Sequence, residues 1–266
     1  MRAGLGELRR DFAVQRHVIG AIVMRELVGR WGRRNLGFAW LFCEPLVFAF
    51  PVMAVWSLVR APFEHGLPMT AFVWTGYMPL LIFRHVTSGA MLSIRGSAAL
   101  LYHRRVTPLD LFIGRQGMEA LGNIASVAIS FIVLVVLGAI DWPDNYQLMV
   151  LGFLYTTWWS LCVALLLAAL SERFEIVPHI WGPIGYLYVF YSGFMMLADW
   201  LPIRLRTYVL AVDPPLHCYE MVRGGMFGHQ VMHPHYDIAY LTWILAMLTL
   251  LGLWLLRDVR QYIELE

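Results

Sequence analysis

Two ionisable residues lie inside long apolar stretches of the sequence, where a charge is costly. Glu44 falls in the stretch 36–59 and Arg84 in the stretch 69–92. A charge inside a bilayer costs at least ~2.5–3.5 kcal/mol unless it is paired or faces water. Arg84 therefore either binds an anion in a wet path or forms a structural ion pair, with Glu44 or Glu119 as the partner. The sequence leaves both interpretations open.

Aromatic residues accompany these charges at helical spacing. Trp40, Glu44 and Phe48 stand at i, i+4 and i+8, so they share one face of a helix. The stretch 177–197 contributes a second aromatic group: Trp181, Tyr186, Tyr188 and Tyr191. A sugar ring packs its apolar face on an aromatic ring, so the set could line a path for a glycan. Taken singly, each ring is better explained by packing or by the aromatic belts of membrane proteins.

The histidines and cysteines do not form a pattern that predicts metal binding or catalysis. His229, His233 and His235 are closely spaced, but no carboxylate or thiol pattern stands beside them, so we favour an ordinary polar loop. No Ser-His-Asp, Cys-His or paired-carboxylate arrangement is evident. We therefore expect no metal site and no enzymatic activity from this chain alone.

The composition of the basic residues excludes a Walker A nucleotide-binding loop. All 20 are arginine, and no lysine occurs in the chain. A Walker A loop uses its lysine to reach the nucleotide phosphates. Any ATP hydrolysis must therefore come from another polypeptide, and we expect no cofactor on this one.

The elements that position these residues are predicted to be membrane helices. The chain is 59% hydrophobic and only 14% charged, whereas a soluble domain is about 25% charged. We predict an all-α polytopic membrane protein with an amphipathic interfacial segment at 1–35 and a transmembrane domain at 36–266. The six predicted spans are 36–59, 69–92, 111–140, 148–170, 177–197 and 236–256.

The N-terminal segment alternates arginines with apolar residues at helical spacing, which predicts a basic helix on the membrane surface. Arg25, Arg30, Arg33 and Arg34 could bind anionic headgroups only, or could also control lateral entry of a lipid-linked molecule. With six spans, 15 arginines fall on the side of the termini and four on the other side. The positive-inside rule therefore places both termini in the cytoplasm.

The region before the last span does not resemble an ordinary loop. The segments 199–212 and 216–227 are too short or too polar to cross a bilayer. We predict a re-entrant hairpin over about 199–228 on the outer face. Such irregular backbone at membrane depth suggests a gated path. The candidate gate residues are Asp213, Pro214, Glu220 and Arg223.

These features together resemble a known family: the permease subunit of type-2 ABC exporters and, more narrowly, the capsular polysaccharide export permease of Gram-negative bacteria. The residues that carry the resemblance are Arg25-Glu26-Leu27, Gly29-Arg30, Leu36-Gly37, Trp40, Glu44-Pro45, Ser171-Glu172-Arg173-Phe174, Tyr191-Ser192-Gly193, Leu201-Pro202, Leu205-Arg206, Asp213-Pro214-Pro215-Leu216-His217, Glu220, Arg223 and Gly224. The family commonly has Asn-Pro where this chain has Asp213-Pro214. The turn is compatible with either residue.

The resemblance implies a homodimer in the bacterial inner membrane, with a channel between two six-span protomers. Each protomer would bind a separate ATPase subunit, which carries ATP and Mg²⁺. The cargo would be a lipid-linked acidic polysaccharide, passed on to a periplasmic co-polymerase or adaptor and to outer-membrane export proteins. Membrane lipids would be further partners, and no nucleic acid is expected.

The basic loop between the second and third spans is the expected contact with that ATPase. A short helix at about 97–105 would insert Leu100, Leu101 and Tyr102 into a groove on the ATPase. His103, Arg104 and Arg105 would then meet an acidic rim. Retention of positive charge in the cytoplasm explains the arginines but not the apolar residues before them.

Other functions remain as alternatives. Within the same superfamily, the cargo could be O-antigen, teichoic acid or another lipid-linked glycan. A membrane-embedded enzyme that modifies glycans or lipids would need acidic or histidine motifs at one membrane face, and none is found. A secondary transporter is disfavoured because the spans are poor in proton-relay residues.

Overall fold

The structure, a computed structural model, is helical in the parts that it describes, namely residues 2–31, 36–59, 63–64, 67–102, 106–194, 196–228 and 233–259. The α-helices are α1 (Arg2–Trp31), α2 (Leu36–Val59), α3 (Met69–Ser88), α4 (Pro108–Val136), α5 (Tyr146–Ser171), α6 (Val177–Tyr191), α7 (Ile203–Val212), α8 (Pro214–Phe227) and α9 (Ile238–Arg257). Two 3-10 helices, η1 (Arg95–Tyr102) and η2 (Ala198–Trp200), lie between them. Strands β1 (Phe63–Glu64) and β2 (Leu67–Pro68) form one antiparallel pair.

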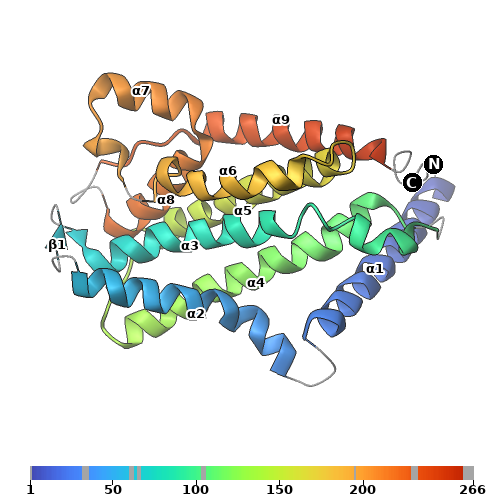
Figure 1. The fold of residues 1–266 in the computed structure, drawn as a ribbon, viewed down its shortest axis with the longest axis horizontal. Helices are drawn as coiled ribbons and strands as arrows, with labels where there is room; N and C mark the ends of the chain where they lie inside the picture. Colours follow the sequence, from blue (N-terminus) through green and yellow to red (C-terminus); the bar gives the residue numbers. More distant parts are fainter. Residues whose placement is uncertain are drawn as a thin grey trace.

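Helices α3, α5, α6 and α9 run side by side along the longest axis of the molecule, whereas α1 lies oblique to them (Figure 1). One end carries the β1–β2 pair, α7 and α8, and we call it the hairpin end. The other end carries α1 and the C-terminus, and we call it the terminal end. Because α5 packs most extensively against α8, α9 and α3, it forms the centre of the bundle.

Helix α3 is enclosed on most sides because its large side chains fill the space between α4 and α5. Trp74 is completely buried, and its Nε1 donates to Ser130 Oγ of α4 at 3.0 Å. Its ring also contacts Phe131 of α4 and Phe153 of α5, each with a centroid distance of 5.5 Å. A buried indole of this kind needs a partner for its N–H, which Ser130 supplies.

Helices α8 and α5 approach each other so closely that only glycine fits between them. A Cβ atom on Gly225 would lie 2.3 Å from the backbone nitrogen of Met149. The backbone nitrogen of Asn145 also donates to the Gly225 carbonyl at 2.8 Å. The two helices are therefore joined backbone to backbone at the hairpin end.

Among the described residues, three helices are long and apolar enough to cross a membrane, namely α4, α5 and α9. Helices α2, α3 and α6 cover most of the other three predicted spans. Three predicted ends are wrong by four or more residues: α3 ends at Ser88 rather than at 92, α4 at Val136 rather than at 140, and α6 at Tyr191 rather than at 197. Gly193, with φ of +84°, turns the chain after α6. Such a positive φ is a conformation that glycine adopts easily.

The predicted helix at 97–105 also differs from the structure. Its described part belongs to η1, which begins at Arg95 and contains a kink at Ser97, where φ is −131° and ψ is 16°. Residues 103–105, with His103, Arg104 and Arg105, lie outside the described residues, as do Arg33 and Arg34. The backbones of Arg30, Trp40, Tyr102 and Tyr191 are described, but their side chains are not.

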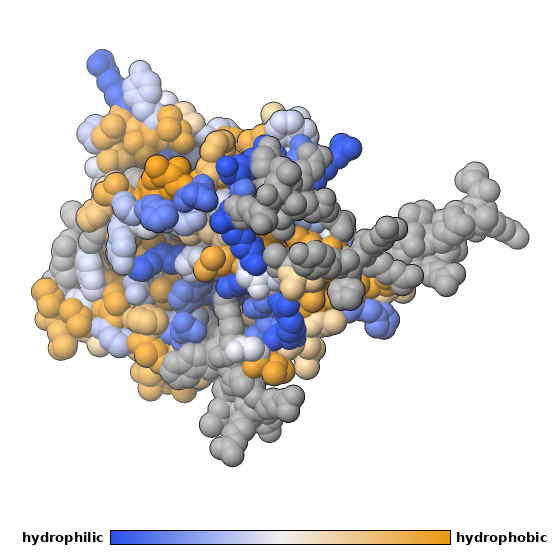
Figure 2. All heavy atoms as spheres, turned by 45° about the vertical axis from the view of Figure 1, so that its right-hand side comes forward, coloured by the Kyte–Doolittle hydropathy of each residue, from blue (hydrophilic) through white to orange (hydrophobic). Residues whose placement is uncertain are grey.

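Many apolar side chains point outward, as expected for helices that face hydrocarbon. Figure 2 shows hydrophobic residues spread over the visible surface between groups of hydrophilic ones. On α9 the exposed large side chains include Trp243, Met247, Leu250 and Trp254.

Candidate functional site

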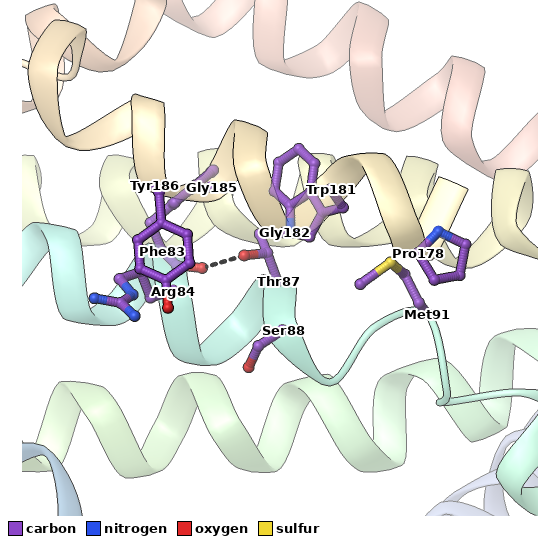
Figure 3. A pocket seen from close by; sticks show the side chains of 10 residues that line it. All are labelled: Phe83, Arg84, Thr87, Ser88, Met91, Pro178, Trp181, Gly182, Gly185 and Tyr186. Carbon is purple, nitrogen blue, oxygen red and sulfur yellow. Dashed lines mark hydrogen bonds between the residues drawn. The ribbon is translucent and has the colours of Figure 1, made fainter. Parts of the chain in front are cut away.

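A groove runs between α3 and α6 and has a volume of about 220 Å³ (Figure 3). We call it the α3–α6 groove. Its lining residues are Phe83, Arg84, Thr87, Ser88, Met91, Pro178, Trp181, Gly182, Gly185 and Tyr186. On each helix they recur every three or four residues, so one face of α3 is opposite one face of α6.

Arg84 and Tyr186 meet at the edge of this groove. The guanidinium carbon of Arg84 lies 5.5 Å from the centroid of the Tyr186 ring. Both side chains are exposed, Tyr186 to 68%. A cation over an aromatic ring at an exposed site is worth about 0.5–1 kcal/mol. The contact positions a positive charge and a flat ring beside the same opening.

Small residues keep the groove open on the α6 side. A Cβ atom on Gly182 or on Gly185 would have no neighbouring atom within 4 Å. The half-buried ring of Trp181 lines the groove next to Gly182. On α3, Thr87 Oγ1 donates to the Phe83 carbonyl at 2.7 Å, so this hydroxyl is satisfied within its own helix (Figure 3).

Tyr188 does not share this surface. It was expected with the other aromatic residues of α6, but it is only 3% exposed and stacks on Phe83 with a centroid distance of 3.8 Å. Tyr186 and Tyr188 are two residues apart, and residues at that separation do not face the same way on a helix. Within the protomer, Tyr188 is therefore a packing residue.

The residues expected on the first span stand apart from the groove. Glu44 is half-buried and Phe48 is 55% exposed, both on α2, and neither lines the α3–α6 groove. The structure thus brings together Arg84, Trp181 and Tyr186 from the residues predicted to line a glycan path. The predicted residues of α2 do not line this groove.

The candidate gate residues at the hairpin end are mostly buried. Arg223 is completely buried and donates to three carbonyls, Gly193 and Met196 at 2.7 Å and Phe194 at 2.6 Å. Its guanidinium carbon also lies 4.3 Å from the centroid of the Phe72 ring. Arg223 therefore fixes the turn after α6 instead of facing an opening.

Glu220, one turn before Arg223 on α8, is also completely buried. Its two carboxylate oxygens accept from the backbone nitrogens of Ala198, at 2.9 Å, and His235, at 3.0 Å. Together with Arg223 it holds the segments on either side of the hairpin. We call these two residues the α8 clamp.

Asp213 lies at the turn between α7 and α8, and Pro214 after it is buried. One carboxylate oxygen of Asp213 is buried without a hydrogen-bond partner among the described residues. Burial disfavours the charged form and raises the pKa of Asp213 to about 7.

Several side-chain bonds join the elements at the terminal end. Arg95 Nε donates to Glu172 Oε2 at 3.0 Å. Ser171 Oγ donates to the Met91 carbonyl at 3.3 Å, and Arg173 Nη2 donates to the Leu255 carbonyl at 2.8 Å. The turn between α5 and α6 is thereby tied to η1 and to α9.

Helix α1 is tied to the same region. Arg25 donates to Ser97 of η1, and Gln15 donates to Asp110 of α4. Asp110 also closes a capping box with Thr107 at the start of α4. The N-terminal helix thus contacts the segment that was expected to meet an ATPase.

The sequence profile of the family described as ABC-2 type transporter matches residues 17–227. The chain belongs to this family. The resemblance found in the sequence is thereby confirmed.

Named relatives narrow the comparison within the ABC-2 family. The chain is 35% identical over 222 residues to the capsule polysaccharide export inner-membrane protein CtrC of Neisseria meningitidis, covering 84% of this chain and 83% of CtrC. It is 32% identical over 256 residues to the capsule polysaccharide export inner-membrane protein BexB of Haemophilus influenzae, covering 96% of each. It is 23% identical over 222 residues to the polysialic acid transport protein KpsM of Escherichia coli, covering 82% of this chain and 84% of KpsM.

Sequence reasoning missed parts of this ABC-2 chain that depend on distant contacts. It grouped Ser171-Glu172-Arg173 with the family motif but did not find the partner of Glu172 at Arg95. It also missed a surface cluster in which Arg206 Nη1 lies 3.0 Å from Asp199 Oδ1 and 2.9 Å from His235 Nε2. The opposite charges of Arg206 and Asp199 were visible, but only the fold places His235 beside them.

The segment expected to enter an ATPase groove also needs a correction. Leu101 is only 6% exposed, and Leu100 packs against the same core, so Leu101 is not available to a partner. The exposed leucine here is Leu92, at 60%. It precedes η1 and was assigned to the second span in the sequence prediction.

Proposed function

We propose that this chain is the membrane-spanning permease of an ATP-driven exporter that moves lipid-linked capsular polysaccharide across a bacterial inner membrane. The observation that carries the proposal is the similarity to BexB over 96% of both chains, since BexB is named as a capsule polysaccharide export protein. The similarity to CtrC points to the same cargo class. ATP and Mg²⁺ would bind to a separate ATPase.

The proposed topology has six spans, formed by α2, α3, α4, α5, α6 and α9, with α7 and α8 as a re-entrant hairpin on the outer face. The concentration of arginines toward the terminal end supports a cytoplasmic position for that end. Helix α6 has only 15 residues, about 22 Å of helix. Because a hydrocarbon core is about 30 Å thick, the residues that follow α6, up to 197, would complete this span.

We place the cargo path along the α3–α6 groove of two protomers. The exposed apolar residues of α6, among them Ile180, Ile184 and Leu187, support a homodimer in which this helix faces its partner. Arg84 would attract the acidic groups of the polymer, while Trp181 and Tyr186 would stack on sugar rings. Stacking tolerates many sugars and registers, which suits a polymer that must slide.

We place the ATPase contact on Leu92 and the exposed part of η1, and we assign the basic residues 103–105, which follow η1 in the sequence, to the same contact. A small apolar side chain within a basic surface would fit a groove with an acidic rim on the ATPase. Helix α1 would lie at the membrane interface. The hydrogen bond that Arg25 of α1 donates to Ser97 of η1 would hold α1 against this segment. Lateral entry of the lipid-linked cargo past α1 completes the proposed route. Beyond the membrane, a periplasmic adaptor and outer-membrane export proteins would receive the polymer.

The test begins with purification of the tagged chain from mild detergent together with its ATPase, followed by reconstitution in lipid nanodiscs. We expect one-to-one co-purification and ATP hydrolysis that rises when acidic capsular polysaccharide is added. The variant Leu92→Asp should lose the ATPase, whereas Phe174→Asp, at a 56% exposed position in the turn between α5 and α6, serves as the control for a new charge outside the spans. Stimulation by a neutral O-antigen but not by acidic capsule would reassign the cargo. A partner-free protein that turns over a lipid-linked sugar would instead identify an enzyme.

A further inference from the structure

A second cavity lies between α4, α5 and α9 and has a volume of about 270 Å³. We call it the three-helix cavity. Its α4 wall is formed by Leu109, Ile113 and Gly117, at i, i+4 and i+8. The other walls come from Trp158, Leu161, Cys162 and Leu165 of α5 and from Thr249 and Leu253 of α9. None of these residues lines the α3–α6 groove.

The polar atoms of the three-helix cavity are already satisfied by one another. Trp158 Nε1 donates to Thr249 Oγ1 at 3.1 Å, and Thr249 Oγ1 donates to the Leu245 carbonyl at 2.7 Å. Cys162 Sγ lies 3.1 Å from the same Thr249 oxygen. The surface that remains is apolar. Apolar cavities of about 150 Å³ in soluble proteins stay dry and bind hydrocarbons, so water is a poor occupant here.

The position of the three-helix cavity indicates which hydrocarbon would occupy it. Its three walls are α4, α5 and α9, each of which is long and apolar enough to cross a membrane. At its mouth, Ile113 is 41% exposed and Leu253 is 37% exposed. The opening therefore faces the surrounding lipid, where acyl chains are the abundant apolar molecule.

A basic residue stands where the headgroup of such a lipid would be. Thr249, Leu253 and Arg257 stand at i, i+4 and i+8 on α9, so they share one face. Arg257 is exposed and is the last residue of α9, at the terminal end of the bundle. A phosphate group at the membrane interface would lie within reach of this arginine, whose long side chain can extend toward the interface.

We propose that the three-helix cavity binds one acyl chain of a membrane phospholipid whose phosphate group pairs with Arg257. With the terminal end cytoplasmic, this lipid belongs to the inner leaflet. It is separate from the proposed cargo path, because α9 and the outer face of α4 do not contribute to the α3–α6 groove. The bound chain fills a gap that the helices leave at their common seam.

The test uses nanodiscs that contain phosphatidylglycerol with a diazirine on one acyl chain. After illumination, we expect cross-links concentrated on the peptides that line the cavity. Gly117→Leu adds a side chain where a Cβ atom meets nothing within 4 Å, so it should fill the space without a clash. It should reduce these cross-links by about tenfold. Ala128→Leu adds bulk at an exposed position of α4 outside the cavity and should leave them unchanged.

Two further variants keep the result decisive. Ile113→Trp closes the mouth from an exposed position, so it reports on the cavity even if Gly117→Leu does not yield folded protein. Arg257→Gln should weaken the labelling, because the phosphate loses its partner, without changing the fold. Equal labelling of wild type, Gly117→Leu and Ile113→Trp would overturn the proposal. Labelling spread evenly over all exposed helix faces would also overturn it, because it would indicate bulk lipid only.

Discussion

Arg95 Nε lies 3.0 Å from Glu172 Oε2, and this bond joins η1 to the turn between α5 and α6. The Glu172 side chain is only 2% exposed, whereas that of Arg95 is 39% exposed. Because α6 begins five residues after Glu172, we expect a displacement of η1 to reach one wall of the α3–α6 groove. The bond thus connects the proposed ATPase contact with the proposed cargo path.

Glu172→Gln should weaken this connection. The neutral amide retains the shape but loses a charge-assisted hydrogen bond, which contributes about 1.5–3 kcal/mol in protected sites and less here because Arg95 is partly exposed. We expect ATP hydrolysis to continue while export per ATP hydrolysed falls severalfold. The measurement is the ratio of transported polymer to released phosphate in proteoliposomes. Glu175→Gln, an exposed glutamate in the same turn, is the matched control, and an unchanged ratio for Glu172→Gln would remove the coupling role.

Arg84→Gln should reduce export of an acidic polymer while leaving the protein folded. Arg84 is exposed, so its loss costs little stability, but the groove loses its positive charge. We expect about a tenfold decrease in transport, equivalent to ~1.4 kcal/mol, and a weaker dependence on salt. Transport of acidic and neutral polymers at two salt concentrations checks this expectation. Arg204→Gln, an exposed arginine on α7, is the control.

Gly182→Leu tests the same groove by volume rather than by charge. Because a Cβ atom at Gly182 has no neighbour within 4 Å, leucine should fit without unfolding and should narrow the path. We expect export to fall by at least about tenfold, with ATPase binding unchanged in a pull-down. Wild-type export from a folded Gly182→Leu protein would place the cargo elsewhere.

Arg223→Met should destabilise the hairpin end. The substitution leaves the carbonyls of Gly193, Phe194 and Met196 without their buried donor. Breaking a buried charged network typically costs about 3–5 kcal/mol, which amounts to a large part of the stability of most domains. Thermal unfolding in detergent measures the loss, and Arg204→Met provides an exposed comparison. A melting temperature equal to that of the wild type would show that Arg223 is not part of a structural clamp.

The raised pKa of Asp213 should make the stability of the folded protein depend on pH. Its pKa is raised from 3.8 to about 7 in the folded protein, so between these values the folded state holds a proton that the unfolded state has lost. Stability should therefore fall as the pH rises from about 4 to 7 and then level off. Asp213→Asn should remove this dependence and raise the melting temperature at pH 8, where the buried carboxylate of the wild type is charged. A pH series of melting temperatures for both proteins decides the matter.

The sequence predicted the helical class and the family, because apolar stretches and arginine placement are local signals. It also predicted that Arg84, Trp181 and Tyr186 belong together, and the structure places all three in one groove. It could not separate Tyr186 from Tyr188, since that depends on Phe83 of α3, on which Tyr188 stacks while Tyr186 stays exposed. Nor could it show that Arg223 and Glu220 bind backbone groups, because their partners lie on segments that come together only in the folded chain.

The segment before α4 shows the same limit. The leucines at 100 and 101 looked available in the sequence, but Leu101 is needed to cover the bundle core. Leu92, assigned to a span because of its apolar neighbours, is exposed once α3 ends at Ser88. The position of a helix end therefore decided which leucine a partner can reach.

The contact of Gly225 with Met149 also limits how the hairpin end can move. Helix α8 cannot tilt or slide against α5 without separating two backbones that are in direct contact. Helix α7 has no buried residues, and it joins α8 through the turn at Asp213. At this end α5 and α8 therefore form one unit through direct backbone contact, whereas α7 is held by side-chain bonds such as that from Tyr240 Oη to the Ala211 carbonyl at 2.6 Å.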